Sequence, residues 1–437
     1  MKVTFKEIQA IFDSFLLMRD RDMVRLTIAS ILGNQMHLRR PIWLMLVAPP
    51  SSGKTTVLNA FYEMEVYGKS GEKIQVVHNI SDLTENSFAS GFKKPGKETS
   101  LLFRMQYGNV MVFKDFTSIL SKRNETKTII MSQLREIYDG QYTKLVGTGD
   151  SIHWEGKLGA VAGVTQAVYE HLESMSVMGD RFMLYQIPQP DRKEMLKFKI
   201  RQERTGTTES VQMPKARALL QEYMQRAFDG MSNEQVVLNE KDEDEIIDVA
   251  DFCTMVRSGI ITNDFSGEIE FVPEPEMPAR MFEQMLALAS IFVYMRKMDD
   301  PDITNADALT QEDYRLIYKI AFDSIPIKRR IALRYLAQYS NGVDTAGLAR
   351  KVGYPTKVVL GWLEQLNALG VAERKTGQGM SNWWVLKDQY RDIMQKLEHI
   401  NVLDESLSEN DAEGTSVERH WNQTMDSTQE AIDNDNW

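Results

Sequence analysis

Cysteine is almost absent from this sequence, which holds only Cys253 among 437 residues. A single thiol excludes a disulfide framework within the chain and a zinc site built on several cysteines. The first residues lack the apolar core and cleavage site of a secretory signal peptide. No uncharged apolar run approaches the roughly 20 residues needed to span a bilayer. We therefore expect a protein of a reducing, cytoplasmic compartment with no membrane partner.

Basic charge is also scarce overall, since 62 acidic residues outnumber 51 Lys and Arg and give a net charge of −11. The balance is uneven along the chain. Residues 401–437 hold ten acidic residues against Arg419 alone and carry −9, which leaves −2 for the rest. Residues 327–397 hold twelve Lys or Arg and five acidic residues, a local +7. The pattern predicts a basic module followed by an acidic tail that lacks apolar clusters and is disordered.

Short apolar runs alternate with helical patterns in the first half of the chain. Unbroken runs of this kind are typical of buried parallel strands, and their alternation with helices indicates an α/β fold with right-handed crossovers. The expected strands are residues 42–47, 74–78, 110–113, 158–164 and 182–187.

Five segments follow from these patterns and from the length of the chain, which allows two or three domains. They are an N-terminal helical segment (1–38), an α/β core (39–213), a helical lid (214–326), a basic helical module (327–400) and the acidic tail (401–437).

A phosphate-binding loop, or P-loop, is the most specific motif. A loop between a strand and a helix presents backbone N–H groups to anionic oxygens, Lys54 would reach the β- and γ-phosphates of ATP, and the Thr55 hydroxyl would bind Mg²⁺. Gly53 allows close approach, and Ala48 replaces the usual first glycine. We assign the ATP-binding loop to Ala48, Pro49, Pro50, Ser51, Ser52, Gly53, Lys54, Thr55 and Thr56.

The metal-binding acid should follow a neighbouring apolar strand, and the run 110–113 is followed by Lys114 and Asp115. Many ATPases end this strand in Asp-Glu, where the glutamate polarises the attacking water. Either Asp115 serves the metal and no glutamate follows, or Asp115 takes the glutamate's position and Lys114 replaces the acid. We favour the first. Asp115 as a simple helix cap is a third possibility.

The order of the later landmarks resembles the AAA+ ATPases, and the run from Met277 to Ser290 looks like the sensor-2 helix of the minichromosome maintenance helicases. The resemblance implies that Thr165, with Gln166 in reserve, contacts the γ-phosphate side. It implies further that Arg181, after Met178-Gly-Asp, and Arg280 complete the ATP site of an adjacent subunit, and hence a homo-oligomeric ring, expected to be a hexamer. The alternative for Arg181 is an ordinary ion-paired arginine.

Residues 133–149 resemble the helix and the pre-sensor-1 hairpin of the same helicases, which line a central DNA channel. Tyr142 and Lys144 would then point toward DNA; the alternative is a surface turn at 147–150. The sequence departs from the family in its single acid after the metal strand and in having no N-terminal oligonucleotide-binding domain or zinc ribbon. A reduced relative of this kind is expected in phages, plasmids or mobile islands, and thus in a prokaryotic or phage-infected cell.

The basic module reads as a helix-turn-helix with a wing. Helical patterns end with the recognition helix 357–367, and two short strands flank Gly377–Gly379. We expect Lys357 and Trp362 to read DNA, Arg374 and Lys375 to bind phosphates, and at least one of Trp383 and Trp384 to lie in the core. Such modules also dock proteins.

Three functions remain open. The first is an ATP-driven ring on DNA, a replicative helicase or a helicase-type replication initiator. The second is an origin-binding switch or loader that does not translocate, which the missing glutamate favours. The third is a remodelling ATPase that acts on protein.

Overall fold

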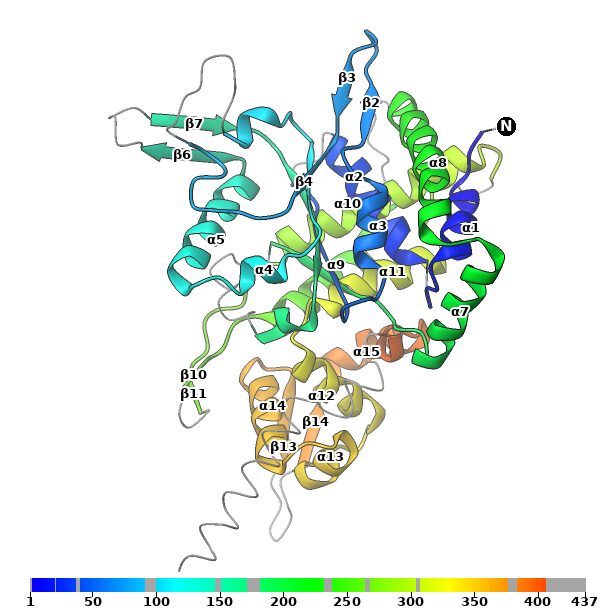
Figure 1. Cartoon of the computed structure of the whole chain (residues 1–437). Helices are drawn as coiled ribbons and strands as arrows, with labels where there is room; N and C mark the ends of the chain where they lie inside the picture. The colour runs from blue at the N-terminus through cyan, green and yellow to red at the C-terminus, as the bar shows by residue number, and fades with distance from the viewer. Residues whose placement is uncertain are drawn as a thin grey trace, which may run out of the picture. The chain divides into compact units, whose positions relative to one another are not determined.

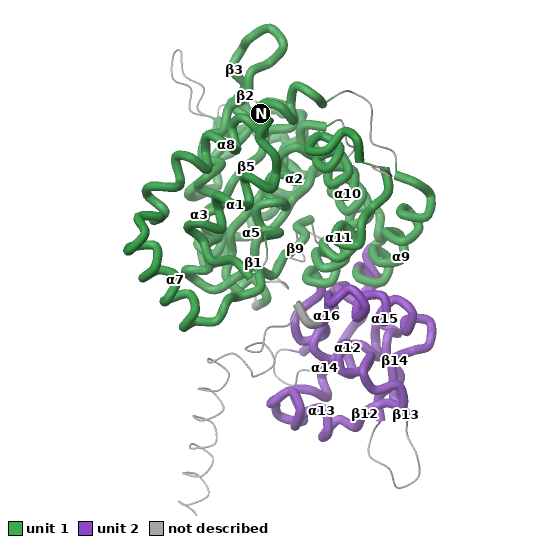
Figure 2. Tube along the Cα trace, turned by 90° about the vertical axis from the view of Figure 1, so that its right-hand side faces the viewer, with its two compact units in different colours: residues 1–253, 277–324 green, residues 254–276, 325–437 purple. Residues whose placement is uncertain are grey.

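The computed structural model describes residues 2–19, 21–36, 40–90, 100–145, 151–170, 181–231, 238–263, 268–303, 307–375 and 383–405. The chain forms two compact units (Figure 2). Unit 1 comprises Met1–Cys253 and Met277–Ser324, and unit 2 comprises Thr254–Glu276 and Ile325–Trp437.

Unit 1 is built on a parallel five-stranded sheet, as the apolar runs predicted (Figure 1). The strand order is β4-β5-β8-β1-β9, so β1 is an inner strand between β8 and β9. All five residues of β1 are buried, because helices pack on both faces of a parallel sheet. The strands are β1 (Trp43–Val47), β4 (Val77–Ile80), β5 (Val110–Phe113), β8 (Gly159–Val164) and β9 (Met183–Gln186).

The strand expected at 74–78 was placed wrongly. Lys73–Gln75 (β3) pairs with Glu65–Tyr67 (β2) in a separate hairpin, and the sheet strand β4 begins at Val77. A second hairpin joins β6 (Gln141–Leu145) to β7 (Ser151–Glu155).

Helices cover the sheet and continue beyond it. In Figure 1, α1 lies beside α8, and α10 beside α2. The helices are α1 (Phe5–Phe15), α2 (Asp22–Gln35), α3 (Lys54–Ala60), α4 (Thr117–Leu120), α5 (Asn124–Asp139), α7 (Arg192–Thr205), α8 (Glu209–Gly230), α9 (Glu240–Arg257), α10 (Ala279–Asp299) and α11 (Gln311–Asp323), with 3-10 turns at Leu102–Arg104 and Gln166–Glu170. None of the helices described is both long and apolar enough to cross a bilayer.

The outer edge of strand β9 is closed by helix α11. The Leu184 and Gln186 N–H groups donate to Ser324 Oγ (3.0 Å) and Asp323 Oδ2 (2.7 Å). Asp323 also pairs with Lys319 at 2.8 Å, and both side chains are fully buried. An edge that would otherwise be open to another strand is therefore occupied by side-chain acceptors.

Among the described residues of unit 2, the first helices after residue 325 pack on a small antiparallel sheet of order β12-β14-β13. The Arg329 guanidinium donates to the carbonyls of Val256 and Ser258 (both 2.7 Å), which fastens residues 254–276 to the rest of the unit. The elements are β10 (Ile261–Thr262), β11 (Ile269–Phe271), α12 (Ile327–Gln338), β12 (Val343–Asp344), α13 (Thr345–Val352), α14 (Thr356–Ala368), β13 (Ala372–Lys375), β14 (Trp383–Leu386), a 3-10 turn (Asp388–Tyr390), α15 (Arg391–His399) and α16 (Val402–Glu405).

Candidate functional site

The loop 48–53 leaves the carboxyl end of β1 and enters α3 in a tight turn. The Ala48 N–H donates to the Val164 carbonyl at 3.1 Å, so the loop begins in register with the neighbouring strand β8. Ser51 (φ 65°) and Gly53 (φ 90°) adopt left-handed backbone. The left-handed conformation favours glycine at position 53, and a Cβ there would lie 2.6 Å from Leu16 Cδ1, which would have to shift.

Lys54 is folded into this loop. Its ammonium donates to the carbonyls of Ala48 (2.5 Å) and Pro49 (2.8 Å) and to Ser52 Oγ (3.1 Å). Burial lowers the pKa of Lys54 to about 8, and the carboxylate of Asp115 opposes that shift. These neutral acceptors compensate the charge poorly, so anionic oxygens at the loop would be better partners.

The sheet order brings Thr165 and Asp115 to the same end as the loop. Because β8 lies between β1 and β5, Thr165 at its carboxyl end sits between the loop and Asp115. Thr117 joins the two: its N–H donates to Asp115 Oδ1 (3.0 Å), and its hydroxyl accepts from the Thr165 N–H (3.1 Å). The sequence interpretation missed Thr117, whose only local signal is its position two residues after the acid.

Lys114, the residue before Asp115, contacts an aromatic side chain. Its ammonium lies 4.6 Å from the centre of the Tyr62 ring, in the turn that follows α3. Asp115 Oδ1 accepts the Thr117 N–H, but the N-cap of α4 is Phe116, and no described residue donates a hydrogen bond to the other oxygen of Asp115. Thr55 is exposed in the first turn of α3. A hydroxyl, a carboxylate and phosphate oxygens together suit Mg²⁺.

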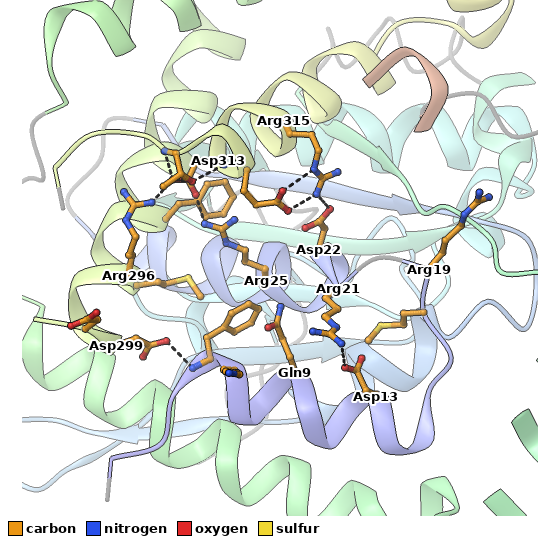
Figure 3. Close-up of a pocket in the computed structure, with 18 of the residues that line it drawn as sticks. Gln9, Asp13, Arg19, Arg21, Asp22, Arg25, Arg296, Asp299, Asp313 and Arg315 are labelled. Atoms are coloured by element: carbon orange, nitrogen blue, oxygen red, sulfur yellow. Dashed lines mark hydrogen bonds and ion pairs between the residues drawn. The ribbon is translucent and has the colours of Figure 1, made fainter. Parts of the chain in front are cut away.

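A large cavity among the described residues lies beside this site rather than in it. It measures about 1010 Å³, and none of its lining residues belongs to the loop 48–56 (Figure 3). Leu16 lines the cavity and also contacts Gly53, so it forms the wall between the two. Inside, Arg25 and Arg296 both bind the fully buried Asp313. This ion network joins α2 to α10 and α11.

Arg181 and Arg280 lie together at the opposite end of the sheet. Arg181 precedes β9, is 5% exposed, and pairs with Asp139 at 2.6 Å above the ring of Tyr138. Burial lowers the pKa of the Arg181 guanidinium, Asp139 opposes this, and the positive charge of Arg280 adds to it. Neither arginine is near the loop of its own chain, and in this arrangement Arg181 is ion-paired. Met178–Asp180, the rest of that motif, lies outside the described residues.

The predicted orientation of the β6–β7 hairpin is wrong for Tyr142. Its side chain is 4% exposed and packs in the core of unit 1. Lys144 donates to the Glu85 carbonyl, Asn86 Oδ1 and the Ala89 carbonyl (3.2, 2.6 and 3.1 Å). An ammonium that uses its three N–H bonds within the chain has none left for phosphate. The turn at 147–150 lies outside the described residues.

In unit 2, Lys357, Arg374 and Lys375 are exposed, as a nucleic-acid contact requires. Trp362, expected on the reading face of α14, is instead 3% exposed and packs edge-on against Tyr354 (4.8 Å). The alternating tryptophans are as predicted, since Trp384 is fully buried. Gly377–Gly379 and the tail beyond residue 405 lie outside the described residues.

In comparisons with known proteins, no family model and no curated protein matches this chain. The case for its function therefore depends on the geometry of the loop and of the two neighbouring strands.

Proposed function

We propose that the chain is a P-loop ATPase of the AAA+ type that assembles as a ring and acts on DNA. The observation that carries the proposal is the buried Lys54 in a left-handed turn at the carboxyl end of an inner parallel strand. The connection after β1 runs toward β4 on one side, whereas the connection after β8 crosses to β9 on the other. Ligands of open α/β sheets bind where connections diverge in this way.

ATP and Mg²⁺ fit the residues present. The first-turn N–H groups of α3 and the Lys54 ammonium would hold the β- and γ-phosphates, in exchange for the carbonyls that now accept from Lys54. Thr55 and Asp115 would hold Mg²⁺, which neutralises phosphate charge during transfer. Thr165 would then face the γ-phosphate from between the loop and Asp115.

The ring follows from the placement of the two arginines. Arg181 and Arg280 lie at the end of the sheet away from the loop. A role in phosphoryl transfer therefore requires the site of an adjacent molecule, as in the AAA+ family, and for Arg181 it also requires release from Asp139. A hexamer is the assembly that the resemblance implies.

DNA is the proposed partner, with unit 2 as a winged-helix module. Lys357 lies in the first turn of α14, and Arg374 and Lys375 belong to β13 beside the predicted wing. These exposed cations support contact with phosphates. The resulting function is a replicative DNA helicase or a helicase-type replication initiator in a prokaryotic or phage-infected cell.

A second candidate is an ATP-dependent switch or loader that does not translocate. It is favoured by the missing glutamate after Asp115, because Phe116 occupies that position and is fully buried. The engaged Lys144 and buried Tyr142 also weaken the case for a DNA-tracking hairpin. A protein-remodelling ATPase is the remaining alternative.

The decisive experiment measures Mg²⁺-dependent ATP hydrolysis by Lys54→Ala beside Lys69→Ala, an exposed lysine on the β2–β3 turn. We expect hydrolysis to fall by about a hundredfold or more in the first and to be unchanged in the second. Parent-level hydrolysis by Lys54→Ala would refute the site. Single-stranded DNA, duplex DNA and a strand-displacement substrate added to the parent protein then separate helicase, switch and remodelling functions.

A further inference from the structure

Helix α7 carries an exposed basic face with two apolar side chains at its centre. Leu196 is 62% exposed and Ile200 54%. Lys193, Lys197 and Arg204 lie on the same side, because residues three and four apart share a helix face. Their charged groups have no ion-pair partner among the described residues. We call these five residues the α7 face.

Helix α9 carries an exposed acidic face that also includes an apolar side chain. Glu240, Asp244, Asp248 and Asp251 recur at intervals of three or four residues and are exposed. Ile247, 45% exposed, lies among them. These five residues form the α9 face.

The two faces complement each other in length, charge and apolar content. Each runs over eleven residue steps, about 16 Å at the rise of an α-helix. One is positive around Leu196 and Ile200, and the other is negative around Ile247. In Figure 2, α7 and α9 lie on opposite sides of unit 1, so the faces of one molecule cannot meet each other.

We infer that the α7 face of one molecule docks on the α9 face of a second copy. Contacts between two different patches are heterologous, and they generate a ring when the rotation closes. The inference rests on the proposed function and deepens it by naming the surfaces that join neighbours. Apolar side chains at the centre of the basic face favour a protein partner over phosphates, because they gain from burial against Ile247.

Charge reversal tests this directly on the full chain. One variant reverses α7 (Lys193→Glu with Lys197→Glu), and a second reverses α9 (Asp244→Lys with Asp251→Lys). A control makes the same change in net charge as the α7 variant at the exposed Lys69 and Arg123 (both to Glu). Sedimentation velocity with ATP and Mg²⁺ at low salt reports assembly. Like charges then face each other in each reversed variant, so we expect assembly at least about tenfold weaker than in the parent or control.

An equimolar mixture of the two reversed variants should recover assembly. Reversed α7 meets reversed α9 at one contact and the original pair forms at the next, so every interface in an alternating ring is complementary. Recovery in the mixture supports the inference, as does weakening of the parent by salt. Assembly of either reversed variant at parent strength, or no recovery by mixing when both remain folded, overturns it. Loss of binding to duplex DNA or anionic vesicles with assembly intact would likewise overturn it.

Binding of a fluorescent ATP analogue separates this outcome from failure of the proposed function. We expect all of these variants to bind the analogue within about twofold of the parent, since neither face includes loop residues. Loss of assembly with intact nucleotide binding concerns the faces alone. A parent protein that binds no nucleotide would contradict the proposed function itself.

Discussion

Thr117 is the residue on which the arrangement of the candidate site depends. Its hydroxyl accepts the Thr165 N–H, and its own N–H donates to Asp115. One residue thus links the ends of two adjacent strands, through its backbone N–H on one side and its hydroxyl on the other. It does not itself supply a charge, so we regard it as a positioning residue.

Replacing Thr117 with valine should lower ATP turnover by about tenfold and leave the KM for ATP within about twofold. Valine keeps the shape but leaves the Thr165 N–H without an acceptor, at a cost of about 1–3 kcal/mol that relaxation of Thr165 would relieve. Thr117→Ser retains the hydroxyl and should approach the parent rate. Steady-state kinetics of the two variants tests this, and equal turnover in valine and serine variants would exclude the positioning role.

Lys157 gives a pH-dependent prediction. It is 5% exposed, donates to the Met36 carbonyl at 3.0 Å, and burial lowers its pKa to about 8. Because the folded pKa lies below the ordinary value near 10.5, the folded state disfavours the charged lysine. That cost is fully present below about pH 8 and disappears as the pH rises toward 10.5.

Lys157→Met should therefore gain stability relative to the parent at pH 7 and lose that advantage at higher pH. The difference in unfolding free energy should shrink by about 1 kcal/mol per pH unit between about pH 8 and 10. Urea unfolding at pH 7, 8, 9 and 10 measures it. A difference that stays constant over this range would show that folding does not lower the pKa of Lys157.

Among the elements, α11 has a double role at the edge of the sheet. Asp323 accepts the Gln186 N–H and also neutralises Lys319, whose ammonium lies 5.0 Å from the Tyr185 ring centre. The helix thus supplies both a cap for strand β9 and the counter-ion for a buried cation.

Asp323→Asn should destabilise unit 1 by about 3–5 kcal/mol, because it removes the carboxylate counter-ion of the buried Lys319 ammonium. Asparagine can still accept the Gln186 N–H, so adding Lys319→Met should restore much of the loss. Thermal unfolding of the parent, both single variants and the pair completes a double-mutant cycle. Additive effects would mean that the ion pair is not coupled.

The strands of the sheet could be predicted because they are short, buried and uniformly apolar. The run 110–113 coincides with β5, and 42–47 contains β1. The strand predicted at 74–78 was placed wrongly because an apolar run does not show which strand each of its residues pairs with. Val76 lies between β3, which pairs with β2, and β4, which pairs with β5.

Some residues of the candidate site could likewise be assigned from the local sequence, whereas others come together only through the order of the strands. Lys54 and Gly53 are set by a contiguous loop and could be assigned from sequence. The approach of Thr117 to Thr165 depends on β8 lying beside β5, which no local pattern encodes. Tyr142 and Trp362 were misplaced because an aromatic side chain on a hairpin or a helix fits a core as well as a DNA surface.

At the scale of the whole molecule, unit 2 is discontinuous in sequence. The predicted module began at residue 327, yet the buried Arg329 takes its acceptors from Val256 and Ser258. Arg329 and Arg330 are also buried, so part of the local +7 is not available to DNA.

A fragment of residues 327–405 should be less stable than one in which residues 254–276 are joined to 325–405 by a short Gly-Ser linker. The first leaves a buried guanidinium without two acceptors, at a cost of at least about 2 kcal/mol. Urea unfolding followed by circular dichroism compares them, with Arg329→Met in each fragment as the control that removes the difference. Equal stability would show that residues 254–276 are dispensable.

The anchoring of Lys144 has a mechanical consequence. The Glu85 carbonyl accepts from Lys144 on the hairpin and from Gln133 on α5, while the Glu85 carboxylate accepts from Thr126. Hairpin, helix and the segment after β4 are thus tied at one point. A displacement of the edge strand β4 would therefore move the β6–β7 hairpin as well. Conversely, a force applied to the hairpin would reach β4, which pairs with the strand that ends near Asp115.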